Sequence, residues 1–274
     1  MNLSELIKEI KQKKTYLCVG LDTEIEKIPK HLLKTKNPVL EFNKSIIDAT
    51  KKHCVAYKIN TAFYEQYGSK GWDIIEKTLE YIPSNFLKIA DAKRGDIGNT
   101  AKMYARTFFE TYIFDAVTVS PYMGVDSITP FLEYKNKITI ALALTSNKGS
   151  NDFQMLQTTN GKVYENVLKK ISQQANPENL MFVAGATNAE KIREIRKIVP
   201  NHFLLVPGVG AQGGDLGEVS ENGLNNNCGI LINSSRSIIY ASNDENYAKA
   251  AENEAMNLAK QMNLFLINKN IISK

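Results

Sequence analysis

The stretch Asp91-Ala92-Lys93-Arg94-Gly95-Asp96-Ile97-Gly98-Asn99-Thr100 gathers charged side chains at the junction between two predicted elements. The apolar run at residues 86–90 predicts a buried strand, and the pattern of residues 101–109 predicts a helix. The charged residues therefore lie at the C-terminal end of a strand, just before a helix. Polar residues also follow other predicted strands of the chain.

Asp91 and Lys93 are two positions apart, so their side chains point to the same side of an extended backbone. Asp96 lies beyond the turn at Gly95, so two carboxylates bracket one ammonium group. Neighbouring negative charge favours the protonated form of a lysine, and a protonated lysine cannot be a Schiff-base nucleophile. The motif predicts a general acid or an electrostatic partner for developing negative charge; taken alone, it also fits an ordinary surface ion pair.

Eight apolar strand candidates run through the chain and mostly alternate with helical patterns. They cover residues 15–20, 54–59, 86–90, 116–119, 138–144, 180–184, 203–206 and 230–233. Continuous apolar runs indicate strands that are covered on both faces, as in a parallel sheet. Eight such units predict an α/β fold, a single (β/α)8 TIM barrel over residues 1–274 with an extra N-terminal helix. The competing doubly wound sheet calls for Gly-x-Gly-x-x-Gly after the first strand, where the chain reads Gly20-Leu21-Asp22-Thr23.

Composition narrows the function classes. No apolar run approaches the roughly 20 residues of a membrane span, and the N-terminal helix carries acids, unlike a signal peptide. Cys18, Cys54 and Cys228 are odd in number and far apart, which favours buried free thiols and a cytoplasmic location. No cysteine or histidine spacing suggests a zinc site. The net charge is +5, but the lysines are scattered, which argues against a nucleic-acid partner.

Polar residues follow several of the predicted strands. They are Asp22, Lys58, Asp91 with Lys93, and Ser146. Because the C-terminal ends of barrel strands meet at one mouth, we expect these side chains to converge there. Lys58, Asp91, Lys93 and Asp96 alternate in sign and are expected to neutralise one another as a network.

Two late loops predict a phosphate site. The seventh strand is followed by Pro207-Gly208-Val209-Gly210-Ala211-Gln212-Gly213-Gly214, and the eighth by Ser234-Ser235-Arg236. Glycines let backbone N–H groups approach an anion, and arginine can donate two parallel hydrogen bonds to phosphate oxygens. The long polar segment 212–229 is expected to form a lid that closes over the bound phosphate.

These motifs together resemble the orotidine 5′-phosphate decarboxylase family over residues 17–240. The family signature D-x-K-x-x-D followed by I-G-N/S-T is complete in residues 91–100. Marks of the longer bacterial subgroup are matched by Lys58-Ile59-Asn60-Thr61-Ala62-Phe63, Pro121-Tyr122-Met123-Gly124, the glycine-rich loop at residues 207–214, and Asn233-Ser234-Ser235-Arg236.

The resemblance implies a cytoplasmic enzyme that converts orotidine 5′-phosphate (OMP) to UMP and CO2 without metal or cofactor, the last step of de novo UMP biosynthesis. In this family Lys93 would stabilise negative charge on C6 of the pyrimidine and protonate it. Asp91 would stand beside the substrate carboxylate and hold Lys93. Lys58 would complete the charged array and bond the ribose, and Asp22 would bind ribose hydroxyls.

The resemblance also implies a homodimer in which Asp96 and Thr100 reach into the partner's site. Ser146 would bond the pyrimidine edge. The phosphate would be held by Pro207, Gly208, Gln212, Gly213 and Arg236. Two alternatives remain: a related barrel enzyme that acts on a sugar phosphate, in some cases with magnesium, and a nucleic-acid binder motivated only by the basic charge.

Overall fold

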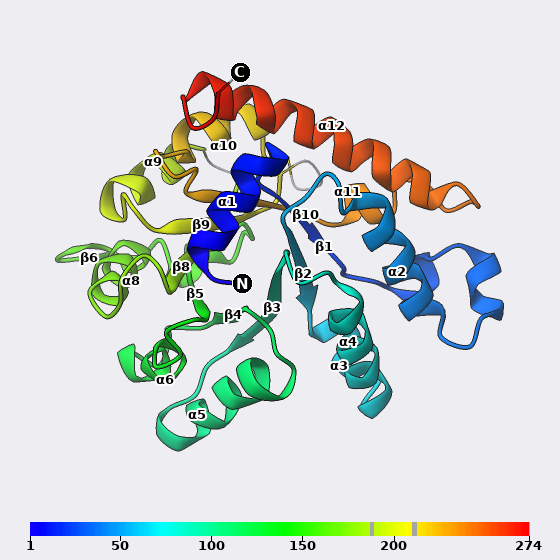
Figure 1. Ribbon diagram of the computed structural model, residues 1–274. Helices are drawn as coiled ribbons and strands as arrows, with labels where there is room; N and C mark the ends of the chain where they lie inside the picture. The colour runs from blue at the N-terminus through cyan, green and yellow to red at the C-terminus, as the bar shows by residue number, and fades with distance from the viewer. Residues whose placement is uncertain (187–188, 210–212, 274) are drawn as a thin grey trace.

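The computed structural model describes residues 1–186, 189–209 and 213–273, and within them eight parallel strands close into a barrel (Figure 1). Their order around the barrel is β1-β10-β9-β8-β5-β4-β3-β2. The strands are β1 (Leu17–Gly20), β2 (Ala56–Asn60), β3 (Leu87–Arg94), β4 (Ala116–Val119), β5 (Ile138–Leu144), β8 (Leu180–Ala184), β9 (Phe203–Pro207) and β10 (Ile230–Ser234). The predicted (β/α)8 barrel is confirmed.

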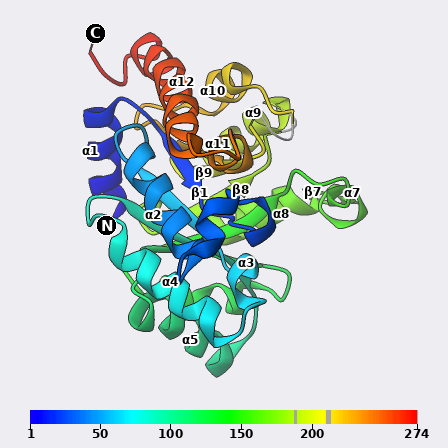
Figure 2. The ribbon, with the colours of Figure 1, turned by 90° about the vertical axis from the view of Figure 1, so that its right-hand side faces the viewer.

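Helices surround the barrel and connect its strands (Figure 1 and Figure 2). They are α1 (Leu3–Lys13), α2 (Pro38–Thr50), α3 (Ala62–Glu65), α4 (Ser69–Tyr81), α5 (Gly98–Arg106), α6 (Thr129–Leu132), α7 (Ser150–Phe153), α8 (Val163–Ser172), α9 (Ala189–Ile198), α10 (Leu216–Gly223), α11 (Arg236–Ile239) and α12 (Tyr247–Asn268). A short hairpin, β6 (Gln157–Thr158) and β7 (Gly161–Lys162), lies between α7 and α8.

The continuous apolar runs become strands that are buried on both faces. Every residue of β1, β4 and β8 is buried, because barrel side chains fill one face and the helices cover the other. This double burial explains why the strands show no alternation of apolar and polar residues in the sequence.

The N-terminal helix α1 lies across the end of the barrel at which the strands begin (Figure 1). It buries Leu3, Leu6 and Ile10. At its end, the Lys13 ammonium donates to the carbonyl of Cys54, just before β2, at 3.3 Å. The extra helix is therefore confirmed. The polar residues that follow the strands lie at the opposite end of the barrel.

The segment 212–229 differs from its prediction as a polar lid. Gln212 lies outside the described residues, but α10 occupies Leu216–Gly223. Asp215 caps this helix by accepting a hydrogen bond from the N–H of Glu218 at 2.7 Å. Leu216 and Val219 are buried, and the helix packs against α9 and α12. The sequence analysis did not predict this helix, because the abundant polar residues concealed a short amphipathic pattern. Closure of the segment over a bound phosphate stays a prediction.

The three cysteines are free and buried, as predicted. Burial raises the pKa of the Cys54 thiol to about 11, so this side chain stays protonated at neutral pH. The cysteines therefore act as small core residues.

The helices of the described residues include none with the length and apolarity that crossing a membrane requires. The longest of them, α12, has 22 residues and packs against α2 and β1.

His202, at the start of β9, is a buried titratable group. Its side chain is 7% exposed, and among the described residues neither ring nitrogen has a hydrogen-bond partner. The ring meets Phe182 edge-on at a centroid distance of 5.4 Å, and the Arg196 guanidinium donates to the His202 carbonyl at 2.6 Å. Burial, with a smaller contribution from the Arg196 charge, lowers the pKa of His202 to about 4.

We therefore predict that His202 weakens the fold in acid. The pKa of His202 is lower in the folded chain than in the unfolded chain. Between pH 6.5 and pH 4, His202 is therefore protonated in the unfolded chain but neutral in the folded chain. Stability present above pH 6.5 is lost towards pH 4, and a shift of this size corresponds to about 3 kcal/mol. Urea unfolding of wild type and His202→Leu at pH 7 and pH 4 measures this. The variant should gain relative stability in acid, whereas an unchanged difference at the two pH values would contradict the prediction.

Candidate active site

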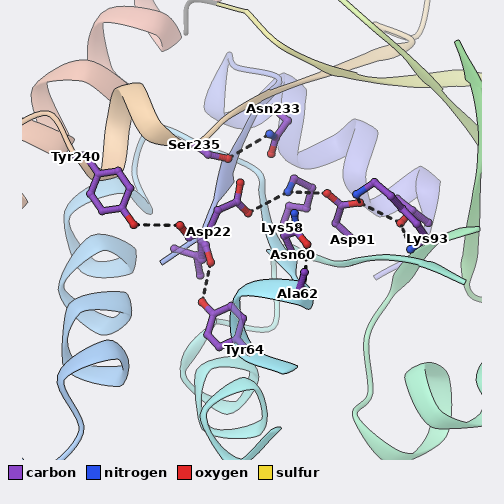
Figure 3. Close-up of polar contacts among 12 residues, drawn as sticks. Asp22, Lys58, Asn60, Ala62, Tyr64, Asp91, Lys93, Asn233, Ser235 and Tyr240 are labelled. Atoms are coloured by element: carbon purple, nitrogen blue, oxygen red, sulfur yellow. Dashed lines mark hydrogen bonds and ion pairs between the residues drawn. The ribbon is translucent and has the colours of Figure 1, made fainter. Parts of the chain in front are cut away.

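Four charged side chains meet where β1, β2 and β3 end (Figure 3). The Lys58 ammonium, on β2, lies 3.2 Å from Asp22 Oδ1 and 3.0 Å from Asp91 Oδ2. The second oxygen of Asp91, on β3, lies 2.6 Å from the Lys93 ammonium. We call Asp22, Lys58, Asp91 and Lys93 the charged array. Asp91 is its centre, because it pairs with both lysines.

Strand register brings the array together. Parallel pairing places Gly20 opposite Lys58 and Asn60 opposite Asp91. Asp22 follows β1 directly, so its carboxylate reaches the Lys58 ammonium across the neighbouring strand end. The predicted convergence of polar residues at one mouth is therefore confirmed for these strands.

The backbone of β3 is irregular at Lys93. Pairing with β4 shifts in register between Ala90 and Arg94, and Lys93 has φ +47°. Thr118 of β4 stabilises this conformation: its hydroxyl accepts from the Lys93 N–H at 2.9 Å and donates to Asp91 Oδ1 at 3.1 Å. Thr118 thus ties the backbone of one array residue to the carboxylate of another.

Burial and charge act in opposite directions on the array. Burial alone would lower the pKa of Lys58, but the carboxylates of Asp22 and Asp91 raise it above its ordinary value. Burial alone would raise the pKa of Asp91, but the two lysines hold it well below its usual range. Lys58 is therefore a cation and Asp91 an anion across the neutral pH range.

The two lysines differ in exposure. The Lys58 side chain is 4% exposed and that of Lys93 is 48% exposed. Lys58 is fixed between two carboxylates, whereas Lys93 contacts Asp91 from the open side. Lys93 is therefore the more accessible cation of the array.

Three members of the array, Asp22, Lys58 and Asp91, line a pocket together with residues from the ends of β9 and β10 and from the loops that follow these strands. The lining residues are Asp22, Lys58, Asn60, Asp91, Pro207, Gly208, Val209, Asn233, Ser234, Ser235 and Arg236. Six of the predicted site residues are thereby brought together: Asp22, Lys58, Asp91, Pro207, Gly208 and Arg236.

The loop after β9 turns at glycines, as expected of an anion site. Gly208 has φ +101° and Gly213 has φ +86°, conformations that residues with a Cβ rarely adopt. The N–H of Gly214 donates to the carbonyl of Gly208 at 3.1 Å, which closes the loop. Arg236 is exposed at the first position of α11 and lines the same pocket as Gly208.

Five predicted residues of the described chain do not line this pocket: Lys93, which joins the array through Asp91, Gly213, which shapes the loop after β9, and Ser146, Asp96 and Thr100. Ser146 lies two positions beyond β5 and is not among the residues that line the pocket. Asp96 accepts a hydrogen bond from the Ile97 N–H at 2.8 Å and, in the described chain, does not join the array. Thr100 is exposed on α5. The expected network of Lys58, Asp91, Lys93 and Asp96 is therefore wrong for Asp96 within one copy, where Asp22 is the second carboxylate.

Close backbone approaches support the site at two glycines that the sequence reasoning did not use. A Cβ atom at Gly185 would lie 2.7 Å from the backbone nitrogen of Ser146. A Cβ atom at Gly20 would collide with the side chain of Ser235. Both glycines directly follow or end a strand, and this position is the signal that could have drawn attention to them.

Thr118 and Asn60 were also missed. Thr118 stands inside an apolar strand, where a threonine is an ordinary strand former, so nothing in its spacing indicates a link to Asp91. Asn60 follows Lys58 by two positions and shares its face of β2, which was the available signal.

Among the described residues, no three side chains of the types His, Cys, Asp and Glu form a group that could hold a metal ion.

The chain matches known proteins over most of its length. Residues 15–251 match the model of the family described as "Orotidine 5'-phosphate decarboxylase / HUMPS family". The orotidine 5′-phosphate decarboxylase of Phocaeicola vulgatus is 59% identical over 266 residues, which cover 96% of this chain and 98% of that protein.

Solved structures agree. The OMP decarboxylase of Leishmania donovani has a TM-score of 0.81 at 34% identity, covering 96% of this chain and 99% of that one. The UMP synthase of the same organism has a TM-score of 0.84 at 35% identity, covering 97% of this chain and 56% of that one. With the match of residues 15–251, these similarities show that the chain belongs to the orotidine 5′-phosphate decarboxylase / HUMPS family.

Proposed function

We propose that this chain is an orotidine 5′-phosphate decarboxylase, which converts OMP to UMP and CO2 and so completes UMP synthesis in the cytoplasm. The observation that carries the proposal is Asp91, held as an anion between Lys58 and Lys93 at the mouth of the barrel. The named relative at 59% identity supports the same reaction. The whole chain, residues 1–274, is taken as one barrel domain that performs it.

Charge movement during decarboxylation fits the array. When the bond between C6 and the carboxylate breaks, CO2 leaves and the electron pair stays on C6 of the pyrimidine. The Lys93 ammonium stabilises this charge and then gives C6 a proton, which solvent replaces on the lysine. Asp91 orients Lys93 and lies where the substrate carboxylate would meet a like charge. That contact raises the energy of the bound substrate but not that of the neutral CO2 product.

The remaining pocket residues divide by chemistry. Asp22 and Lys58 present a carboxylate and an ammonium to the ribose hydroxyls. Pro207, Gly208, Gly213 and Arg236 line or shape the wall that takes the phosphate, together with Gln212. Ser146, two positions beyond β5, bonds the pyrimidine edge. No step calls for a metal or an organic cofactor.

A second copy of the chain would complete the site. Asp96 and Thr100 lie outside the pocket of their own copy, and exposed apolar side chains stand near them on the same segment, with Ile97 48% and Met103 43% exposed. Covering these side chains in a homodimer removes apolar surface from water. The same contact would bring Asp96 and Thr100 to the partner's charged array.

Turnover of OMP is the direct test. Purified wild type in EDTA should remove the ultraviolet absorbance of OMP, and Lys93→Ala should be slower by about 100-fold or more, because the proton donor is lost. No turnover by folded wild type would contradict the decarboxylase. Inactivity on OMP combined with magnesium-dependent turnover of a sugar phosphate would favour the sugar-phosphate alternative. Full activity in Lys93→Ala would retain the reaction but exclude Lys93 as the acid.

Mixing two inactive variants tests the shared site. If Asp96 acts in the partner's site, a dimer of one Lys93→Ala and one Asp96→Ala chain contains one site with both native residues. An equimolar mixture, allowed to exchange subunits, should recover about a quarter of wild-type activity, since half of the dimers are mixed and each has one intact site. Each variant alone is the control. A mixture no more active than its components would show that Asp96 acts within its own chain.

A further inference from the structure

The loop after β1, which carries Asp22, is held by the hydroxyl groups of two tyrosines (Figure 3). Tyr64, after β2, donates to the carbonyl of Leu21 at 2.7 Å. Tyr240 makes two contacts: its hydroxyl donates to the carbonyl of Asp22 at 3.1 Å and accepts from the N–H of Glu24 at 2.7 Å. Removing the Tyr240 hydroxyl would leave both backbone groups of this loop without that partner.

Tyr240 adjoins the short helix α11, whose first residue, Arg236, lines the pocket. It follows α11, and its backbone N–H donates to the carbonyl of Arg236 at 3.2 Å. Arg236 and Tyr240 therefore begin and end a single helical turn. The Tyr240 ring stacks on Phe42 at a centroid distance of 6.0 Å, which limits its freedom to swing away. Burial raises the pKa of Tyr240 to about 12, so its hydroxyl keeps the proton that it donates.

Contacts continue from this loop into the charged array. Asp22 Oδ1 lies 3.2 Å from the Lys58 ammonium, and Lys58 pairs with Asp91 at 3.0 Å. Hydrogen bonds and ion pairs, connected through the covalent structure of Tyr240 and Asp22, thus lead from Arg236 to Lys58. Lys58 in turn pairs with Asp91, the carboxylate that binds Lys93. A chain of this kind can transmit coupling between two ends of a ligand.

We propose, building on the function proposed above, that Tyr240 is a positioning residue that couples phosphate binding at Arg236 to the placement of Asp22 in the charged array. An anion at Arg236 restrains α11, and Tyr240 passes this restraint to the backbone of Asp22 and Glu24. The phosphate end of the substrate thereby helps to fix charges that act at its other end.

Hydrogen exchange tests the coupling without any turnover, with inorganic phosphate as the probe. In the full-length protein, saturating phosphate should slow exchange of the segment around Asp22–Glu24 several-fold. Tyr240→Phe should lose this slowing. Tyr64→Phe is the matched control, because it removes the other tyrosine hydroxyl that binds this loop. Tyr64 lies in α3 and not next to α11, so this variant should retain the response. A thermal midpoint for each variant confirms folding. No slowing in wild type, or equal slowing in Tyr240→Phe, would overturn the proposal.

A double-mutant cycle tests the same coupling in OMP turnover. Tyr240→Phe should lower kcat/KM by about 10- to 100-fold, the scale of two lost hydrogen bonds, but by less than about threefold when Arg236→Ala is already present. Tyr64→Phe should cost the same factor in both backgrounds. An equal loss of kcat/KM on Tyr240→Phe in the wild-type and Arg236→Ala backgrounds would overturn the coupling. Wild type that shows the phosphate response but no decarboxylation would instead contradict only the proposed function.

Discussion

The charged array depends on one carboxylate, Asp91, shared by two ammonium groups. Lys58 is almost completely buried, and an unpaired ammonium there would carry a large desolvation cost. Asp91 and Asp22 offset this cost together, while Lys58 and Lys93 keep Asp91 ionised. Lys58 and Asp91, the two most buried members of the array, therefore depend on their partners to stay charged. The ends of β1, β2 and β3 must therefore stay aligned closely enough for these side chains to remain within hydrogen-bond distance of one another.

The barrel supplies that register, and local irregularities adjust it. Parallel pairing sets Lys58 beside Gly20 and Asp91 beside Asn60. A regular strand would continue past Asp91 without the register shift and positive φ observed at Lys93. Thr118 holds this departure by binding both the Lys93 backbone and the Asp91 carboxylate. Backbone strain thus occurs at the residue whose ammonium must face a ligand, as is common at functional sites.

The sequence allowed the barrel and the charged residues to be predicted, because double burial and charge at strand ends both leave local patterns. Thr118, Tyr64 and Tyr240 left none: a hydroxyl that bonds a distant segment looks the same in sequence as one that only packs. Helix α10 was obscured by its polar composition, and its anchoring depends on contacts with α9 and α12 that form only in the fold. Asp96 and Thr100 carry a clear motif, yet one copy of the chain does not bring them to the array; their place in a partner's site, which the resemblance implies, stays a prediction.

The difference in exposure between the two lysines argues for a division of labour within the array. A buried ion pair seldom adds stability over apolar packing, so Lys58 between two carboxylates is poorly explained as a structural device. The desolvation cost of Lys58 is explained if Lys58 fixes the position of Asp91. A fixed Asp91 carboxylate can orient the exposed Lys93 and repel a second carboxylate. Asp22 pairs with Lys58 from its other side and so also helps to fix the array. Since Tyr240 holds the backbone of Asp22 and lies one helical turn from Arg236, the rigidity of the array reaches the wall that the phosphate would contact.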